Sequence, residues 1–408
     1  MTKKLIILGA TGSIGRQTLE CVEEANHRLP GSFEVTGLSA NSDLKGLLEL
    51  SKRYPGALLA LGSTGFSTGG QVAVSAELNA ELKQESEKIL RLELARSLKF
   101  IGGDAVEQLL EHCNADLVVN GIAGSSGLKA SYLALQNGMN LALANKESVV
   151  MGFGLLSSLA RKSSLSILPV DSEHAALFQL VNRCGIPSVQ ELCITASGGP
   201  FRDKSLKELE AIRPAQAAAH PVWKMGKKIS IDSATLANKG LELIEAVRLF
   251  GFPEQRVRVL IHPQSLVHAL VRTVDGSLYA NLSRPDMRLP IDIALQWPDE
   301  VESAFGRLDL AGKTLSFFDP DLLRFPMLRL ARESLRQGEA AAIAYNASNE
   351  VAVEAFVEGR IRFTDIARVV ENSLSADWSL PAEDLDSIFY HDGKARENAR
   401  SFVAEIQC

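Results

Sequence analysis

The sequence predicts an α/β protein made of an N-terminal Rossmann-like dinucleotide-binding domain, a central α+β domain and a C-terminal helical bundle. First, a glycine-rich turn separates an apolar run from a helix-period stretch at the start of the chain. Second, strand-like and helix-like segments alternate to about residue 150, which is typical of a parallel sheet covered by helices. Third, apolar residues recur with a helical period from residue 327 to the end. A chain of 408 residues has room for two or three such domains.

The composition is that of an ordinary globular protein, with 46% hydrophobic and 23% charged residues. The formal charge of −6 comes without a long basic stretch, so no nucleic-acid partner is expected. No apolar run approaches the roughly 18 residues that span a bilayer, so no membrane partner is expected either. Five scattered cysteines without C-x-x-C spacing indicate reduced thiols and a cytoplasmic protein, not a disulfide framework or a structural zinc site.

The first expected element is a strand over residues 4–8, followed by the string GATGSIG at 9–15. The lysines and the apolar run could be taken for a signal peptide, but the glycine-rich continuation favours a strand. A helix over 16–25 and a strand over 33–38 complete a βαβ unit. Glycines at this place let the backbone approach a pyrophosphate, so the unit predicts a bound nucleotide; a tight turn without a ligand is the alternative.

The residues after the second strand bear on the choice of cofactor. An acidic residue at the strand end would bind the ribose 2′-hydroxyl of NAD, but Asn41 and Ser42 precede Asp43. Lys45 is near enough in sequence to meet a 2′-phosphate. The segment therefore favours NADP.

The first domain continues with alternating elements. We expect helices over 44–53, 106–111 and 128–137, and strands over 58–61, 100–102, 116–120 and 140–143. Residues 62–70 could be a phosphate loop, but no G-K-[ST] follows, so a surface loop is favoured. Asn145, Lys146 and Glu147 follow the last strand, where ligands bind in open α/β sheets. Lys146 could be a surface lysine, but this position favours contact with a ligand.

Two carboxylates follow the next apolar run, at 165–170. If this run is a buried strand, alternation along it places Asp171 and Glu173 on the same side. Two carboxylates so close repel each other unless a cation or a proton neutralises them. The pair suggests a divalent metal site; a buried acid pair that acts only as a cap is the alternative.

Beyond this point the pattern becomes α+β. We expect a strand over 189–195 and antiparallel strands over 257–262, 265–274 and 277–282, with a hairpin turn at Asp275-Gly276. Residues 298–326 have little periodicity and read as a linker. The C-terminal bundle is expected to have helices over 328–337, 340–358, 364–374, 382–388 and 393–406.

Two segments of the central domain could complete a site. Residues 220–226 form a Pro- and Gly-bounded loop that suits a lid over a site, although a loop packed permanently on the core is the alternative. A strand over 229–232 should lead into a helix on which Asn238, Lys239 and Glu242 share one face. A plain Lys239–Glu242 ion pair would explain part of this face. With the two earlier carboxylates, however, Glu242 completes an oxygen ligand set for Mg²⁺ or Mn²⁺.

Several of these strings resemble those of the 1-deoxy-D-xylulose 5-phosphate reductoisomerase family, in the same order and over nearly the whole chain. They are GATGSIG (9–15), LANKES (143–148), PVDSEH (169–174), SGGPF (197–201), HPVWKMG (220–226), DSATLANKGLE (232–242), IHPQS (261–265), PDMR (285–288), NASNE (346–350) and RFTD (362–365). The resemblance implies a homodimer with a cofactor-binding domain (1–150), a catalytic metal- and substrate-binding domain (151–297), a linker (298–326) and a helical domain (327–408).

The resemblance also implies residue roles. The metal ligands would be Asp171, Glu173 and Glu242, which together with Lys146 form the catalytic set. Substrate would be bound by Lys146, Ser172, Glu173, Ser197, His220, Trp223, Ser233, Asn238, Lys239 and Glu242, with the phosphate at Ser197, Ser233, Asn238 and Lys239. NADPH would be bound by Thr11, Gly12, Ser13, Ile14, Asn41, Asn145, Glu147 and Gly226. His174 and His268 would be close to the site, as hydrogen-bonding neighbours of its residues.

The implied reaction is the rearrangement of 1-deoxy-D-xylulose 5-phosphate and its reduction by NADPH to 2-C-methyl-D-erythritol 4-phosphate, with one Mg²⁺ or Mn²⁺ per site. It belongs to the non-mevalonate synthesis of isoprenoid precursors. The chain departs from the family at 41–43, where a Lys-Asn pair is common and Asn-Ser-Asp stands instead. Two alternatives stay open: a semialdehyde or hydroxy-acid dehydrogenase, for which Cys184 and Cys193 would be candidate nucleophiles, and a nucleotide-sensing protein without activity.

Overall fold

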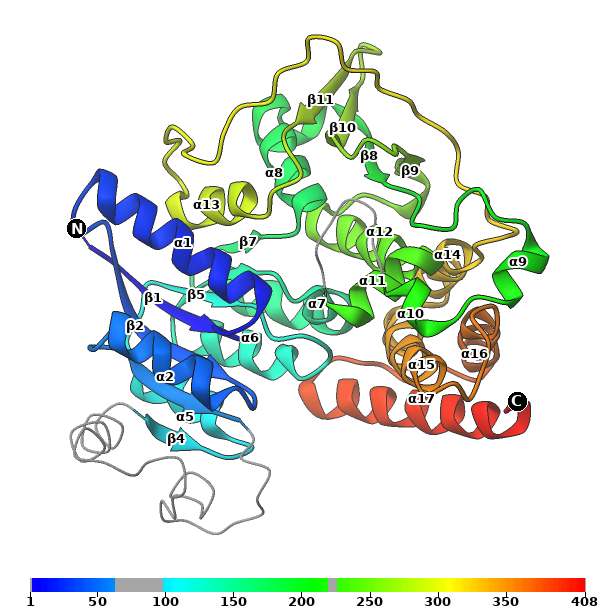
Figure 1. Cartoon of the computed structure of the whole chain (residues 1–408), viewed down its shortest axis with the longest axis horizontal. Coiled ribbons are helices and arrows are strands. Elements are labelled where there is room, and N and C mark those ends of the chain that lie inside the picture. The colour runs from blue at the N-terminus through cyan, green and yellow to red at the C-terminus, as the bar shows by residue number, and fades with distance from the viewer. Residues whose placement is uncertain (1, 63–97, 219–225, 408) are drawn as a thin grey trace.

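The computed structural model describes residues 2–62, 98–218 and 226–407, which form two sheets and a group of C-terminal helices (Figure 1). The first sheet is parallel and has seven strands. Its strands are, in spatial order, β4 (Leu98–Ile101), β3 (Leu58–Leu61), β2 (Phe33–Ala40), β1 (Lys3–Leu8), β5 (Leu117–Asn120), β6 (Asn140–Leu143) and β7 (Ile167–Pro169). The predicted Rossmann-like sheet is therefore present, and it continues past the predicted domain boundary at residue 150.

Helices cover both faces of this sheet because its central strands are apolar on both sides, as the complete burial of residues 5–8 in β1 shows. One face packs against α1 (Ser13–Arg28), α2 (Leu44–Arg53) and α13 (Arg288–Gln296). The other packs against α5 (Ala105–His112), α6 (Gly127–Gln136) and α7 (Lys146–Lys162). The strand order reverses between β1 and β5, so the carboxyl ends of these strands form the switch point where open α/β sheets bind ligands.

The second sheet has four strands in the order β11 (Leu278–Leu282), β10 (Val267–Thr273), β8 (Val189–Ala196) and β9 (Val257–Ile261). The hairpin at Asp275-Gly276 is confirmed, since β10 and β11 pair antiparallel. The prediction that β9 is antiparallel was wrong, because β9 pairs parallel with β8. The long helical connection between them allows this pairing. One face packs on α8 (Ser172–Cys184) and α12 (Ala237–Phe250).

The connection from β8 to α12 contains α9 (Leu206–Glu210), α10 (Pro214–Ala217) and α11 (Lys227–Thr235). Two short 3₁₀ turns, Ile186–Ser188 and Glu254–Arg256, precede β8 and β9. Residues 298–326, which the structure describes throughout, contain no helix or strand apart from a bridge between Phe318 and Ile261. That this segment is a linker stays a prediction.

The C-terminal helices are α14 (Met327–Gln337), α15 (Glu339–Val357), α16 (Asp365–Leu374) and α17 (Leu385–Ile406). The alanine-rich α15 is almost entirely buried, and α12 approaches it so closely that a Cβ at Gly240 would lie 2.3 Å from the hydroxyl oxygen of Tyr345. The prediction of two helices at 382–388 and 393–406 was wrong, because α17 is continuous. Gly393 disfavours a helix by about 1 kcal/mol, but the buried Ala395, Ala399 and Val403 hold α17 in place.

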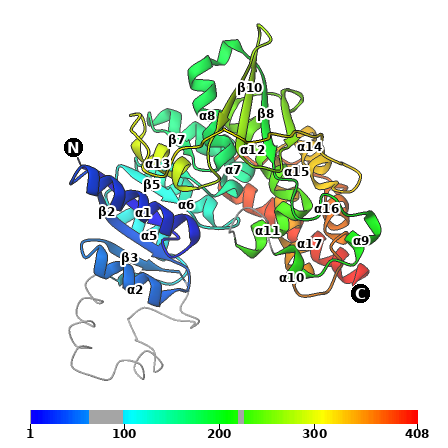
Figure 2. The same ribbon diagram turned by 45° about the horizontal axis from the view of Figure 1, so that its top comes forward.

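The parts of the molecule are arranged side by side. The seven-stranded sheet lies on one side, the C-terminal helices on the other, and α7 and α12 between them (Figure 2). Within residues 2–62, 98–218 and 226–407, no helix is long and apolar enough to cross a membrane.

Candidate active site

A cleft with a volume of about 790 Å³ lies between the start of α1, the segments after β6 and β7, and the start of α12. Most of the candidate residues within the described part of the chain line it. These are Ser13, Ile14, Lys146, Asp171, Ser172, Glu173, Ser197, Gly226, Ser233, Asn238, Lys239 and Glu242. The candidate lid residues His220 and Trp223 lie outside the described residues.

Asp171 and Glu173 are close together for a different reason than the sequence suggested. The strand β7 ends at Pro169, and Asp171 is the N-cap residue of α8, where its carboxylate accepts a hydrogen bond from the Glu173 amide at 3.2 Å. A helix start, not alternation along a strand, therefore places both carboxylates at the cleft. The expected acid pair is present, but the structural argument for it was wrong.

Glu242 reaches the same point from α12. One carboxylate oxygen each from Asp171, Glu173 and Glu242 lies within 4.8 Å of the other two. Glu242 is only 2% exposed, so its charge has little access to water. Three carboxylates this close are the oxygen donor set that Mg²⁺ and Mn²⁺ prefer.

Two lysines neutralise these carboxylates. Lys146 Nζ lies 3.0 Å from Asp171 Oδ2 and 3.2 Å from Glu242 Oε1, and it donates to Asn238 Oδ1 at 2.7 Å. Lys239 Nζ lies 3.1 Å from Glu173 Oε1 and is also paired with Glu242. The i,i+3 pair of Lys239 and Glu242 predicted as the alternative is thus real, but it is buried within the carboxylate cluster instead of lying on a wet face.

Burial and charge act against each other on these groups. Burial lowers the pKa of Lys146, but Asp171 and Glu242 outweigh it and raise that pKa well above its usual value. Burial raises the pKa of Asp171, but Lys146 outweighs it and holds the carboxyl ionised. The pKa of Glu242 is raised, first by burial and then by the charge of Asp171. In such a cluster a bound cation or a substrate group could take the place of a lysine as the partner of a carboxylate.

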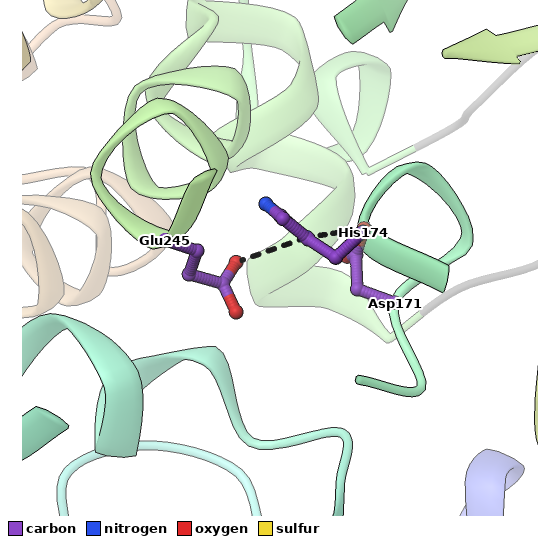
Figure 3. A group of neighbouring side chains, drawn as sticks. All are labelled: Asp171, His174 and Glu245. Carbon is purple, nitrogen blue, oxygen red and sulfur yellow. Dashed lines mark hydrogen bonds and ion pairs between the residues drawn. The ribbon is translucent and has the colours of Figure 1, made fainter. Parts of the chain in front are cut away.

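Behind Asp171 lies a fully buried histidine, His174, which faces Glu245 (Figure 3). His174 Nδ1 donates to Asp171 Oδ1 at 3.1 Å, and its Nε2 donates to the backbone oxygen of Glu242 at 2.9 Å. Although burial favours the neutral ring, the charges of Glu245 and Asp171 raise the pKa of His174 to about 9. The imidazolium thus joins two of the three carboxylate-bearing residues and fixes their relative position.

Asp171, His174 and Glu245 form a second group whose ligand atoms lie within 4.8 Å of one another. Both nitrogens of His174 are engaged by oxygen acceptors, and neither His174 nor Glu245 lines the cleft. A metal ligand needs a free lone pair and access. The group of Asp171, Glu173 and Glu242, which faces the cleft, is therefore the better cation site.

The start of α12, next to the carboxylate cluster, is suited to an anion. The prediction of a strand over 229–232 was wrong: α11 runs from Lys227 to Thr235 and is separated from α12 by Leu236, whose φ of 63° is left-handed. This break places the N-terminus of the 14-residue α12 at the cleft. The Ala237 amide there donates to Thr235 Oγ1 at 3.2 Å, and the amides that follow it in the first turn could bind an anion. Ser233, Asn238 and Lys239 line the cleft beside it.

The loop after β8 borders the cleft near Ser233 and packs closely against α11. Gly199 has a φ of 70°, and a Cβ there would lie 2.8 Å from the Ser233 carbonyl oxygen. Only glycine allows this conformation so close to α11. The loop carries Ser197, whose hydroxyl accepts a hydrogen bond from the Gly199 amide at 3.2 Å.

The glycine-rich turn meets the cleft at the start of α1. A Cβ at Gly15 would lie 2.4 Å from the Gly9 carbonyl oxygen, so the turn can close only with glycine at this position. The turn leads into α1 without a capping side chain, which leaves helix N–H groups for a pyrophosphate. Ser13 and Ile14 line the cleft, while Thr11 and Gly12 lie just before them, beyond its lining.

Asn145 and Glu147 are buried beside this turn instead of lining the cleft. Asn145 caps α7 by accepting from the Ser148 amide at 2.8 Å, and its Nδ2 donates to the carbonyl oxygens of Ile122 and Gly124. Glu147 Oε2 accepts from Asn145 at 2.9 Å. The two side chains thus hold the turn after β5. Asn41 is exposed after the end of β2.

Several cleft residues had no predicted role. Residues 285–288 carry the string PDMR and form one wall, together with Gln17 and Glu20 of α1. Arg288 donates to Asp286, and its Nη1 lies 3.2 Å from Glu20 Oε2. This ion pair joins the wall to α1, the helix that follows the glycine-rich turn. PDMR belongs to the resemblance, which was the only signal in the sequence that could have pointed to this wall.

The thiols do not support the dehydrogenase alternative. Cys193 is buried in β8, where burial raises its pKa to about 12, the opposite of what a nucleophilic thiol requires. Neither Cys184 nor Cys193 lines the cleft.

Comparison with known proteins finds family profiles and relatives that match nearly the whole chain. The profile of 1-deoxy-D-xylulose 5-phosphate reductoisomerase matches residues 5–153, and two profiles of the C-terminal domain of these enzymes match 167–250 and 282–398. The 1-deoxy-D-xylulose 5-phosphate reductoisomerase of Treponema denticola is 41% identical over 404 residues, 99% of this chain and 98% of the relative. That of Ralstonia nicotianae is 42% identical over 406 residues, 98% of each.

Solved structures with the same fold include a DOX-P reductoisomerase in complex with NADPH, fosmidomycin and magnesium, with a TM-score of 0.86 and 36% identity over 98% of both chains. The 1-deoxy-D-xylulose 5-phosphate reductoisomerase from Zymomonas mobilis in complex with NADPH has a TM-score of 0.84 and 38% identity over 99% of both chains. The predicted fold class is thereby confirmed.

Proposed function

This chain belongs to the 1-deoxy-D-xylulose 5-phosphate reductoisomerase family, and we propose that the 790 Å³ cleft is its active site. The enzyme rearranges 1-deoxy-D-xylulose 5-phosphate and reduces the product with NADPH to 2-C-methyl-D-erythritol 4-phosphate, a step in the synthesis of isoprenoid precursors. The single observation that carries the assignment of the site is that a carboxylate trio, an anion-binding helix start and a nucleotide-type turn share one cleft.

The carboxylate trio fits a divalent cation. Asp171, Glu173 and Glu242 offer only oxygen donors, within 4.8 Å of one another, which suits Mg²⁺ or Mn²⁺. When bound, the cation would act as a Lewis acid on the ketone and neighbouring hydroxyl of the substrate. His174 holds Asp171 and the backbone of Glu242 in place for this purpose.

The start of α12 provides the proposed phosphate site. The helix N-terminus and the hydroxyls of Ser197 and Ser233 offer hydrogen bonds, and Lys239 offers a positive charge. Binding the phosphate here fixes the substrate by a group remote from the reacting carbons. With the phosphate bound there, the reacting carbons would lie beside the carboxylate trio, which lines the same cleft.

Lys146 is placed to handle substrate oxygens. Its ammonium is held protonated and faces Asp171, Glu242 and Asn238. A substrate oxygen that replaces one of these acceptors would receive a charge-assisted hydrogen bond from Nζ. Ser172, whose hydroxyl donates to Glu173 at 2.5 Å, lies beside it and is proposed to contact the sugar part of the substrate.

The glycine-rich turn is proposed to bind the NADPH pyrophosphate through Thr11, Gly12, Ser13 and Ile14. Asn145 and Glu147 support it from behind, by fixing the turn after β5, and Asn41 lies at the adenosine end. Gly226, which lines the cleft at the start of α11, is proposed to contact the cofactor from the substrate side. The family resemblance adds His220 and Trp223 as a lid.

Three broader assignments are also proposals: the division into parts at 150, 297 and 326, a cytoplasmic location and a homodimer. The dimer is supported by the edge strand β11, where Leu278 and Tyr279 are 52% and 48% exposed. An exposed apolar edge strand is a surface that natural proteins usually cover. Light scattering should therefore give twice the chain mass, and Tyr279→Lys should shift it toward the monomer.

The decisive assay is NADPH oxidation with 1-deoxy-D-xylulose 5-phosphate, with and without Mn²⁺. We expect turnover that a chelator abolishes and added Mn²⁺ restores. Turnover that survives chelation but is lost on thiol alkylation would contradict the proposed site and favour a cysteine-dependent dehydrogenase.

A further inference from the structure

An ion pair at the adenosine end of the cofactor turn has no role in the site described so far. Arg16 lies in the first turn of α1, directly after Gly15, and Asp43 directly precedes α2. The closest nitrogen of the Arg16 guanidinium, Nη2, is 3.8 Å from Asp43 Oδ2. Neither residue lines the cleft.

We propose that Arg16 is the residue of this chain that selects NADPH over NADH, by binding the 2′-phosphate, and that Asp43 opposes this selection. The proposal rests on the proposed function, because it requires a dinucleotide at the glycine-rich turn. It goes beyond that function by naming how a chain with Asn-Ser-Asp at 41–43 can still prefer the phosphorylated cofactor.

The position of the pair is the first argument. In Rossmann folds the residue just beyond the second strand faces the ribose 2′ position, where an acid favours a hydroxyl and a nearby arginine a phosphate. In this chain β2 ends at Ala40, and Asp43 follows three residues later. The pair therefore brings both of these groups, the acid and the arginine, to the place where NAD and NADP differ.

Close packing around Asp43 strengthens this placement. A Cβ at Gly46 would lie 2.3 Å from Asp43 Oδ2 and 3.0 Å from Thr11 Cγ2. The start of α2 thus packs directly against the glycine-rich turn. Asp43 Oδ1 accepts a hydrogen bond from the Gly46 amide at 2.9 Å, which holds the carboxylate beside the turn.

The guanidinium is held at one end and accessible at the other. Arg16 Nε donates to the Thr11 carbonyl oxygen at 2.8 Å, which anchors the side chain to the turn. Its side chain is 53% exposed, and that of Asp43 is 48% exposed. At 3.8 Å the pair is too long for a hydrogen bond, so an incoming phosphate would not have to break one.

The two charges have opposite effects on a 2′-phosphate. A guanidinium binds phosphate through a planar fork of N–H donors, whereas a carboxylate repels it. Lys45 is the alternative cation, since it is exposed in the first turn of α2. Arg16 is preferred because it is already oriented toward the ribose position by Thr11 and Asp43.

The experiment measures binding of 2′,5′-ADP and of 5′-AMP to the full chain by calorimetry, because these nucleotides differ only in the 2′-phosphate. Arg16→Met should weaken 2′,5′-ADP at least about tenfold and 5′-AMP less than about threefold. Arg16→Lys should recover part of the loss. Asp43→Asn, which keeps a capping side chain, should strengthen 2′,5′-ADP about threefold or more. Lys45→Met is the matched control and should change neither affinity.

Three results would overturn the proposal. Equal loss of both nucleotides in Arg16→Met would mean that Arg16 only supports the turn through Thr11. A selective loss in Lys45→Met in place of Arg16→Met would assign the phosphate to Lys45. An unchanged or weaker 2′,5′-ADP affinity in Asp43→Asn would remove the opposing role of Asp43. If the unaltered protein bound neither nucleotide, the proposed function would fail with it, so the two failures are distinguishable.

Discussion

At the scale of single residues, two lysines and three carboxylates form ion pairs in the cleft. Each charge offsets the cost of burying its partners. Glu242 is the most buried of the carboxylates and faces both lysines. Removing its charge should therefore affect the cation more than the fold, because Lys146 and Lys239 keep their partners Asp171 and Glu173.

Glu242→Gln is expected to reduce metal-dependent turnover at least about a hundredfold, since one anionic ligand is lost at a site that needs all three. Its thermal unfolding midpoint should stay within a few degrees of the original. Steady-state rates across a Mn²⁺ titration measure the effect. A variant with full activity would remove Glu242 from the cation site.

Lys239→Ala separates the phosphate role from the cation role. We expect the KM for 1-deoxy-D-xylulose 5-phosphate to rise about 10- to 100-fold, as a charge-assisted hydrogen bond is lost. The Mn²⁺ concentration for half activation should fall, because a competing positive charge leaves Glu173 and Glu242. Lys207→Ala, on the surface helix α9, is the control. An unchanged KM would contradict the phosphate role.

The residue types of the site could be recognised from sequence, but their geometry could not. Carboxylates and lysines after apolar runs indicate metal and anion chemistry whichever element carries them. The contact between Lys146 and Glu242 joins residues 96 positions apart, and only the tertiary fold produces it. The cap that places Asp171 beside Glu173 was missed because periodicity alone does not show where a short strand ends.

At the scale of elements, the helix α7 begins at the site with Lys146 and then bends at Gly152, which has a φ of −139° and a ψ of 21°. Arg248 of α12 donates to the carbonyl oxygens of Val149 and Val150, just before the bend, and pairs with Glu339 at 2.7 Å. This arginine is 7% exposed, so the carbonyl oxygens depend on it for their hydrogen bonds.

Arg248→Met should lower the free energy of unfolding by about 2–4 kcal/mol, because two buried carbonyl oxygens lose a charged donor. Urea unfolding measures the loss. The control is Glu339→Gln, which removes a partner that is 58% exposed and should cost less than about 1 kcal/mol. Equal losses in both variants would show that Arg248 contributes to stability through its ion pair with Glu339, and not through its hydrogen bonds to α7.

Most elements of the first sheet could be predicted because strand and helix periods alternate cleanly there; α2 and β3 have the expected bounds. The prediction failed where tertiary contacts outweigh local pattern. Residues 229–232 alternate like a strand, yet they are helical because α11 packs its Ile231 and Ala234 into the core beneath the C-terminal helices. The left-handed Leu236 between α11 and α12 has no sequence signal, since leucine rarely takes this conformation.

At the scale of the whole molecule, charged groups join parts that are far apart in sequence. Glu254, which follows α12, pairs with Arg332 and Arg336 of α14 at 2.6 Å each. Burial would raise the pKa of Glu254, but the hydrogen bonds from these arginines outweigh it and lower the pKa. The central part and the C-terminal helices are therefore held together by an ionised carboxylate.

The sign of the resulting pH dependence follows from this lowered pKa. The stabilisation is complete above the unfolded-state value of about 4.3 and is lost as the pH falls through the lower folded-state value. Glu254→Gln should be about 1 kcal/mol less stable than the original chain at pH 7, and the difference should shrink as the pH falls below about 4.3. Thermal unfolding across this range tests it. A gap that persists at low pH would mean that packing, not charge, is responsible.

A second sheet of a different kind could be predicted from the change of pattern, although the first sheet continues past residue 150 to β7. The way the two sheets are joined could not be predicted. Neighbouring residues at the start of α7 face different partners: Lys146 reaches Asp171 and Glu242, while Glu147 reaches Lys228 of α11. Lys228 Nζ is 3.3 Å from Glu147 Oε1 and 2.9 Å from Asp232 Oδ2. This bridge connects α11, which leads to the proposed phosphate site, with Glu147, which helps to hold the turn after β5.

Hydride transfer requires that cofactor and substrate keep a fixed separation. Lys228 joins Glu147, on the proposed cofactor side, to Asp232 of α11, on the proposed substrate side. Lys228→Met should lower kcat about tenfold with little change in either KM, and it should raise the isotope effect with NADPH deuterated at the transferred hydrogen, because hydride transfer becomes slower than product release. Glu147→Gln should act through the same link, so the double variant should be no worse than either single one. Lys227→Met, the exposed neighbour, serves as the control. Additive losses, or an unchanged isotope effect, would mean that Lys228 stabilises α11 without positioning the reactants.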